Sequence, residues 1–120
     1  MRASDAAARV LLASRAVYAG EWTTYGDLGA AATDGGRAAR LAARLASVHP
    51  EFANSHRVLA SGGRVSHPRG EEAEGRRRRA RLESEGVTFR GRTADPERRV
   101  RWIELRGRLR ELEAGQRPTA

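Results

Sequence analysis

The sequence predicts a mainly α-helical protein with a winged-helix-like helix-turn-helix and a short β-hairpin. Two helical patterns, over residues 24–32 and 37–47, are separated by the helix-breaking triplet Asp34-Gly35-Gly36. Two short segments, Val58-Leu59-Ala60 and Arg64-Val65-Ser66, flank Ser61-Gly62-Gly63 in the pattern of a hairpin with a glycine turn. The chain has 120 residues, which is enough for one small core and too few for two domains with separate cores.

The first two helices are predicted from their N-terminal caps. Ser4-Asp5 has the composition of an N-cap, and apolar side chains follow it at helical spacing as far as Gly20. A second short helix is expected to open at Thr24, because a threonine hydroxyl can accept a hydrogen bond from a backbone N–H of the first turn. This helix is expected to continue to about Ala32.

The third helix, over residues 37–47, is expected to end before His49-Pro50. Its apolar face is marked by leucines four residues apart, and a neighbouring face carries Arg37, Arg40 and Arg44. The second helix of a helix-turn-helix lies against DNA, so these arginines are candidate phosphate and groove contacts. The alternative is an ordinary solvated helix face.

The C-terminal half is predicted to contain two further helices. A charged helix over residues 71–84 is closed by Gly86 at a C-cap, and residues 87–89 form a short extended segment. Pro96 is expected to start the last helix, with an imperfect apolar stripe and a frayed tail from Gly115. The members of the stripe are Val100, Ile103, Leu105, Leu109 and Leu112.

The charge balance favours a polyanionic partner. All 23 basic side chains are arginine, against 15 acidic ones, which gives a formal charge of +8. A compositional bias towards arginine and alanine would give the same excess without nucleic-acid binding. The arginine run over residues 76–81 is interspersed with glutamates and predicts a solvated helix with phosphate contacts at its rim.

Several classes of protein are excluded by composition. The chain has no lysine for Schiff-base chemistry, and no cysteine for thiol catalysis, disulfides or thiolate metal sites. His49, His56 and His67 are scattered without a carboxylate cluster, so we expect no metal and no cofactor. No apolar run approaches the roughly 20 residues that span a bilayer, and the N-terminus lacks a signal-peptide core. A cytoplasmic, nucleoid-associated location without membrane contact is expected.

Two motifs stand about thirty residues apart: Thr23-Thr24-Tyr25-Gly26-Asp27-Leu28 and then Asn54-Ser55-His56-Arg57-Val58. In this order they resemble the DNA-binding domain of O6-alkylguanine-DNA alkyltransferases. In that family a Thr-Tyr-Gly core precedes a Pro-Cys-His-Arg-Val active site, and Ser55 stands here at the position of the alkyl-accepting cysteine. The chain therefore resembles alkyltransferase-like proteins, the relatives that bind alkylated DNA without repairing it.

The resemblance runs from about Ala6 to Trp102 and includes a downstream Glu-Gly-Val segment at residues 85–87. It implies an alkyltransferase-like DNA-binding domain over residues 1–102. Residues 103–120 are then a C-terminal helical extension and tail.

The resemblance also implies binding to the minor groove of double-stranded DNA. Tyr25 matches the tyrosine that rotates the target nucleotide, and Arg40 the arginine that replaces it in the stack, with Arg37 as the alternative. Thr24 and Arg44 complete the implied DNA-binding set. Extrusion makes physical sense because a modified base edge cannot be inspected inside a stacked duplex. The alternative for Tyr25 is an ordinary helix-packing tyrosine.

A lesion pocket is implied as well, formed by Asn54, Ser55, His56, Arg57 and Arg69. Arg69 is offset by one residue from the pocket arginine of lesion-sensing relatives, and Arg57 more often anchors the fold than touches ligand. Most alkyltransferase-like proteins carry proline and tryptophan where this chain has Asn54-Ser55. Because serine is smaller and more polar than the tryptophan indole, the pocket of this chain is expected to be roomier and more polar. His56 is expected to pair structurally with Glu85.

The resulting hypothesis is a non-enzymatic protein that recognises alkylated guanine by nucleotide flipping and flags it for excision repair. Nucleotide excision repair proteins are the implied partners. One alternative is a general DNA-binding or regulatory protein that has lost lesion specificity, which the Asn54-Ser55 departure favours. The other is an enzyme with Ser55 as nucleophile and His56 as base, although no Gly-x-Ser-x-Gly elbow is present.

Overall fold

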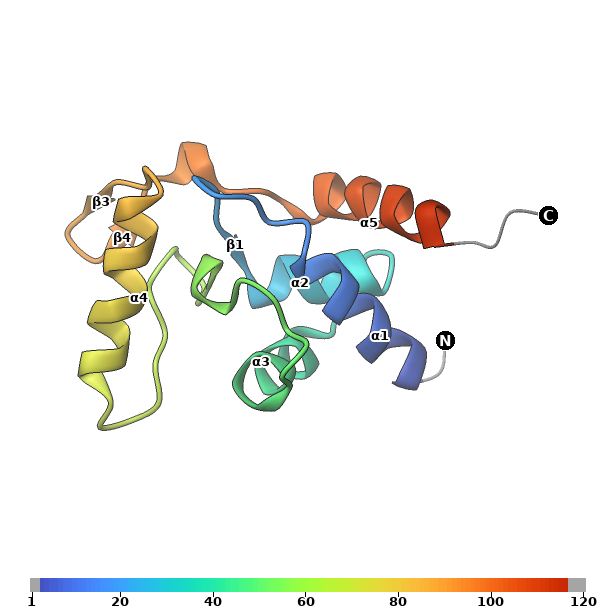
Figure 1. The fold of residues 1–120 in the computed structure, drawn as a ribbon, viewed down its shortest axis with the longest axis horizontal. Coiled ribbons are helices and arrows are strands. Elements are labelled where there is room, and N and C mark those ends of the chain that lie inside the picture. The colour runs from blue at the N-terminus through green and yellow to red at the C-terminus, as the bar shows by residue number, and fades with distance from the viewer. Residues whose placement is uncertain (1–2, 117–120) are drawn as a thin grey trace.

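Four helices enclose the larger of two hydrophobic cores. They are α1 (Ala3–Ser14), α2 (Tyr25–Ala32), α3 (Ala39–Val48) and α5 (Trp102–Gln116). The remaining helix, α4 (Glu72–Ser84), lies at the other end of an elongated molecule, beside a small hairpin (Figure 1). The computed structural model describes residues 3–116. The mainly helical class with a helix-turn-helix and a short hairpin is confirmed.

The first helix ends earlier than expected, at Ser14. Its last turn tightens, because Arg15 N donates to Leu12 O and Ala16 N donates to Ala13 O. Residues 15–20 then form a loop in which the Tyr18 side chain is exposed. The predicted helical spacing up to Gly20 was wrong, because Ala16 and Val17 are buried from a loop and not from a helix.

The helix-turn-helix matches the prediction closely. Helix α2 has the expected bounds, and the Thr24 hydroxyl accepts a hydrogen bond from Asp27 N as its N-cap. Helix α3 begins at Ala39, two residues later than expected. An ideal Cβ on Gly29 would lie 2.4 Å from the carbonyl carbon of Ala38, so only glycine allows α2 to approach the start of α3 this closely.

The β-structure is arranged differently from the prediction. Strand β2 (Val58–Leu59) pairs in parallel with β1 (Thr23–Thr24), and the expected 58–66 hairpin is reduced to one antiparallel bridge between Ala60 and Arg64. The short hairpin of the fold is formed instead by β3 (Phe89–Arg90) and β4 (Thr93–Ala94). Parallel pairing joins segments about 35 residues apart, and no local sequence pattern signals it.

The last helix also starts later than predicted. Pro96 opens a short 3-10 turn, after which the chain is extended beside Trp22. Trp22 N donates to Arg98 O and Val100 N donates to Trp22 O. Helix α5 begins at Trp102 and ends at Gln116, so the first two residues of the predicted frayed tail are helical. Residues 117–120 of that tail lie outside the described part. Ile103, expected in the apolar stripe, is exposed.

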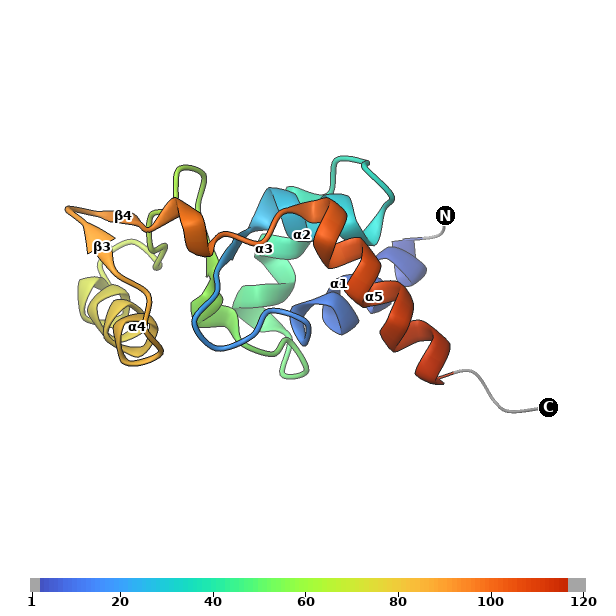
Figure 2. The same ribbon diagram turned by 90° about the horizontal axis from the view of Figure 1, so that it is seen from above.

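Helix α5 packs along α1 and α2, as Figure 2 shows from above. Its Leu105 and Leu109 are fully buried in the same core as Val10 and Leu28. The predicted boundary between residues 102 and 103 thus falls in the first turn of α5, and the division into domain and extension stays a prediction.

A second, smaller core joins the other end of the molecule to the helix-turn-helix. Its buried members are Trp22, Leu59, Leu82, Val87 and Ala94. The Trp22 indole N–H donates to Asp95 O over 2.7 Å, which ties the chain after β4 to the start of β1. In the described residues 3–116, no helix is both long and apolar enough to cross a bilayer.

Candidate functional site

The start of α2 is fixed by a buried network around Asp27. The Thr24 hydroxyl donates to Asp27 Oδ2 over 2.9 Å, and Arg99 donates to the same oxygen from Nε over 2.9 Å. The Arg99 Nη2 atom lies 2.8 Å from it as well. Asp27 is only 6% exposed, so the guanidinium offsets the cost of burying its charge. Arg99 was not predicted, although a buried aspartate in a cap motif requires a partner of this kind.

Tyr25, the first residue of α2, is half-buried at the edge of the larger core. Its hydroxyl lies 2.8 Å from the Ser66 hydroxyl, in the segment that follows β2. This contact joins the helix-turn-helix to the loop over residues 60–71. The role of Tyr25 in nucleotide rotation stays a prediction.

Helix α3 presents arginines on its exposed side. Ala42 and Leu45 are buried against the core, whereas Arg40 and Arg44, one turn apart, are exposed. Arg37 is exposed in the segment that precedes the helix. The leucine spacing of the sequence therefore predicted the buried face correctly.

A depression of about 580 Å³ lies between the N-terminal end of α2, α3 and the turn after β2. Three of the predicted DNA-binding residues line it: Thr24, Tyr25 and Arg40. Arg99 lines it too, whereas Arg37 and Arg44 lie outside it. The structure thus brings together the implied rotating tyrosine and the implied intercalating arginine.

The His56 imidazole belongs to a polar cluster beneath the 3-10 turn Ser55–Arg57. His56 Nε2 lies 3.1 Å from both carboxylate oxygens of Glu85, which is the expected pair. Arg57 binds the same carboxylate with two parallel hydrogen bonds, of 2.9 Å from Nε and 2.6 Å from Nη2. Its Nη1 donates to Val17 O over 2.9 Å. Arg57 is therefore an anchor between three segments of the chain.

Burial and hydrogen bonding set the protonation states of this cluster. The two hydrogen bonds from Arg57 lower the pKa of Glu85 to about 2, against the opposing effect of burial. Burial lowers the pKa of His56 below its ordinary value, although Glu85 acts in the opposite direction. At neutral pH the His56 imidazole is therefore neutral and the Glu85 carboxylate is charged.

The predicted pocket residues do not all converge. Asn54 has a left-handed backbone, with φ of 58°, and its amide donates to Ser14 O and Val17 O behind the C-terminal end of α1. Ser55 is half-buried at the start of the 3-10 turn. Arg69 is exposed in the loop between β2 and α4. None of these residues lines the depression that contains Tyr25 and Arg40.

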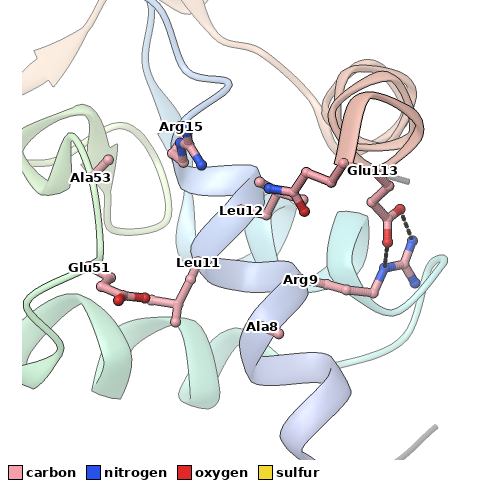
Figure 3. A pocket seen from close by; sticks show the side chains of 9 residues that line it. Ala8, Arg9, Leu11, Leu12, Arg15, Glu51, Ala53 and Glu113 are labelled. Carbon is pink, nitrogen blue, oxygen red and sulfur yellow. Dashed lines mark hydrogen bonds and ion pairs between the residues drawn. The ribbon is translucent and has the colours of Figure 1, made fainter. Parts of the chain in front are cut away.

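A further hollow lies on another part of the surface. It is formed by α1, the segment over residues 51–53 and the C-terminal end of α5 (Figure 3). The guanidinium of Arg9 pairs there with Glu113, and Leu11 and Leu12 supply apolar lining. No predicted site residue belongs to this hollow. In the described residues, no three histidine, aspartate or glutamate side chains are grouped so that they could hold a metal ion.

Comparison with known proteins relates the chain to a family of DNA-binding domains. A family model described as "6-O-methylguanine DNA methyltransferase, DNA binding domain" matches residues 5–87. A search of curated proteins gave no match. Among solved structures, the chain is similar to Atl1 of S. pombe, crystallised with damaged DNA containing O6-carboxymethylguanine. The identity is 27% and the TM-score 0.65, over 84% of this chain and 99% of Atl1.

Proposed function

Since the chain belongs to the family of the 6-O-methylguanine DNA methyltransferase DNA-binding domain, we propose that it binds double-stranded DNA and recognises alkylated guanine there. The surface that makes this contact is the exposed side of α3 together with the N-terminal end of α2. The similarity to Atl1, whose structure contains O6-carboxymethylguanine DNA, supports damaged DNA as the ligand. The excess of arginine supplies the attraction to phosphate.

The proposed mechanism is extrusion of the modified nucleotide from the duplex. The single observation that carries it is the shared depression of Tyr25 and Arg40, which come from the two helices of the helix-turn-helix. Tyr25 would rotate the nucleotide while Arg40 fills the gap in the stack. An alkylated guanine pairs poorly, so it costs less to extrude than an unmodified base.

The protein acts on the lesion without removing the alkyl group. Transfer by this family needs a thiolate, and the chain has no cysteine. Ser55 is a much weaker nucleophile, and the neighbouring His56 directs Nε2 to Glu85. A bound lesion that is not repaired has to be handed on, and nucleotide excision repair proteins in the cytoplasm are the proposed recipients.

Extrusion can be tested with a fluorescent base analogue opposite or beside O6-methylguanine. Addition of the protein should raise the fluorescence as the base unstacks, and Tyr25→Phe should keep more of this signal than Tyr25→Ala. The phenylalanine variant loses only the hydroxyl contact with Ser66. Equal signals for the parent and Tyr25→Ala would remove the proposed role of Tyr25.

Mass spectrometry can test whether the protein removes the alkyl group from the lesion. Stoichiometric incubation with O6-methylguanine duplex should leave both the lesion and the protein mass unchanged, and Ser55→Ala should bind DNA as the parent does. An added methyl group on Ser55 would make the protein an enzyme and refute the proposal.

A general DNA-binding or regulatory protein is the second candidate. It is favoured by the contacts of Asn54, whose side-chain amide donates to the carbonyl oxygens of Ser14 and Val17. Asn54 thus stabilises the fold and does not point its amide at a lesion. Such a protein would bind lesion-free duplex as tightly as damaged duplex.

A further inference from the structure

Helix α4 and the β3–β4 hairpin lie together at one end of the molecule (Figures 1 and 2). This end carries a second basic surface. A cleft of about 500 Å³ separates α4 from this hairpin and from the loop that follows β2. We call it the α4 cleft. Four arginines are among the residues that line it, Arg64, Arg76, Arg79 and Arg92, together with His67 and Phe89.

The walls of the α4 cleft are held by backbone contacts. Arg64 forms an antiparallel bridge with Thr93, and Ala94 N donates to Gly63 O over 2.9 Å, so the loop is joined to the hairpin. On the opposite wall, an ideal Cβ on Gly75 would lie 2.5 Å from the His67 ring. Glycine at this position therefore lets the imidazole lie directly on α4.

One arginine is oriented in advance. The Arg79 guanidinium lies 4.5 Å from the centre of the Phe89 ring, and its Nη1 donates to Gly91 O over 2.7 Å. These contacts hold its planar group at the cleft, so less side-chain freedom is lost when it binds a ligand.

The remaining charges of the cleft are not neutralised within the molecule. Among the described residues, Arg64, Arg76 and Arg92 form no ion pair, and Arg79 has only a loose one with Glu83, at 3.6 Å. Glu72 is the single carboxylate that lines the cleft.

The other side of α4 differs. There Glu74 pairs with both Arg77, at 2.8 Å, and Arg78, at 3.2 Å. Arg77 and Arg78 are therefore paired within the helix, whereas Arg76 on the cleft side is not. Unpaired guanidinium groups gathered in one cleft favour an anionic ligand there.

We propose that the α4 cleft binds the phosphodiester backbone of DNA, outside the contact made by α3. This inference rests on the proposed function, because it assumes that DNA is the ligand of the molecule. A guanidinium group can donate two parallel hydrogen bonds to the oxygens of one phosphate. A linear polyanion such as the DNA backbone can also contact several of these arginines at once. The backbone comes either from the flank of the duplex held by α3 or from a second duplex.

The test compares two variants of equal net charge. Arg76→Ala with Arg92→Ala removes two unpaired arginines of the cleft. Arg77→Ala with Arg110→Ala removes two arginines outside it, whose partners are Glu74 and Asp34. Circular dichroism checks that both variants keep the fold. Affinity is measured against salt concentration with a short duplex that covers only the helix-turn-helix contact and with a duplex long enough to extend well beyond it.

The slope of log affinity against log salt is negative, and each lost phosphate contact reduces its magnitude by about 0.9. The cleft variant should therefore lose about 1.8 in slope on the long duplex and little on the short one, while the control variant follows the parent on both. If a second duplex is bound instead, the parent should take up two short duplexes and the cleft variant one.

An unchanged slope and unchanged stoichiometry for the cleft variant would overturn the inference. If neither duplex binds the parent at low salt, the proposed function itself fails. If the short duplex binds and depends on Arg40, that function stands independently of the α4 cleft.

Discussion

At the scale of single residues, the Glu85 carboxylate makes one contact that was predicted from the sequence and one that was not. Its pairing with His56 was predicted from the Glu-Gly segment, and the contact is present. The bidentate grip of Arg57 on the same carboxylate was not predicted, because Arg57 and Glu85 are 28 residues apart and either could have found another partner. The hydrogen bonds of Asn54 with the end of α1 were missed for the same reason.

The polar cluster predicts how stability depends on pH. The pKa of Glu85 is lowered to about 2, so its contribution is complete above its ordinary pKa of 4.5 and is lost as the pH falls from 4.5 towards 2. The pKa of His56 is also lowered, by burial, so the unfolded chain takes up its proton first and stability falls below pH 6.5. Both groups make the protein less stable in acid.

Denaturant unfolding at a series of pH values measures this dependence. Glu85→Gln should be less stable at pH 7 and should flatten the curve below pH 4.5, whereas His56→Gln should flatten it just below pH 6.5. Glu83→Gln, an exposed neighbour, is the control. A parent whose stability is constant from pH 7 to pH 3 would contradict the charge states derived for the cluster.

Arg40 is expected to contribute more to DNA binding than the other arginines near α3. It is the only one of the three predicted α3-region arginines that lines the depression with Tyr25. Stacking in place of a base contributes about 1–3 kcal/mol, so Arg40→Ala should weaken DNA binding by about an order of magnitude or more. Arg44→Ala, which removes an exposed arginine of the same helix, should have the smaller effect of one lost phosphate contact.

Fluorescence anisotropy with a labelled duplex distinguishes the two variants. A larger loss for Arg44→Ala, or for Arg37→Ala, would mean that a different arginine enters the stack and that the match to Arg40 is wrong.

At the scale of elements, local signals predicted what local forces determine. The Thr24 cap, the glycine-closed end of α4 and the leucine face of α3 all depend on residues within one or two turns, and all were predicted correctly. The predicted start of the last helix, at Pro96, was wrong. Residues 96–101 are held instead in a 3-10 turn and an extended segment beside Trp22. The hairpin was misplaced because β2 pairs with β1.

Gly29 provides the test of the helix-turn-helix itself. Alanine is favoured over glycine in a helix by about 1 kcal/mol, but here its Cβ would meet the backbone of Ala38 at 2.4 Å. Gly29→Ala should therefore force α2 and α3 apart, destabilise the protein by about 1–3 kcal/mol and weaken DNA binding.

Gly107→Ala is the matched control, because a Cβ there meets nothing within 4 Å on α5. It should stabilise the protein by about 0.5–1 kcal/mol. Thermal unfolding measures both variants, and equal gains in stability would show that Gly29 imposes no close approach between α2 and α3.

At the scale of the whole molecule, two hydrophobic cores support two regions of the protein. The larger core supports α3 and the start of α2, and the smaller one supports the α4 end, which carries the unpaired arginines of the α4 cleft. Net charge and family resemblance together predicted a DNA-binding protein before any geometry was known. The lesion pocket could not be assembled from sequence, because Asn54-Ser55 departs from the family pattern and its contacts are long-range.

The central claim is that the protein distinguishes alkylated guanine from guanine, and the most direct measurement is the affinity for two duplexes that differ only in that base. Fluorescence titration at one salt concentration, with and without O6-methylguanine, gives the ratio of the two dissociation constants. The account predicts clearly tighter binding of the damaged duplex, and Arg40→Ala should reduce this ratio. Equal affinity of the parent for both duplexes would contradict damage recognition and leave a general DNA-binding protein.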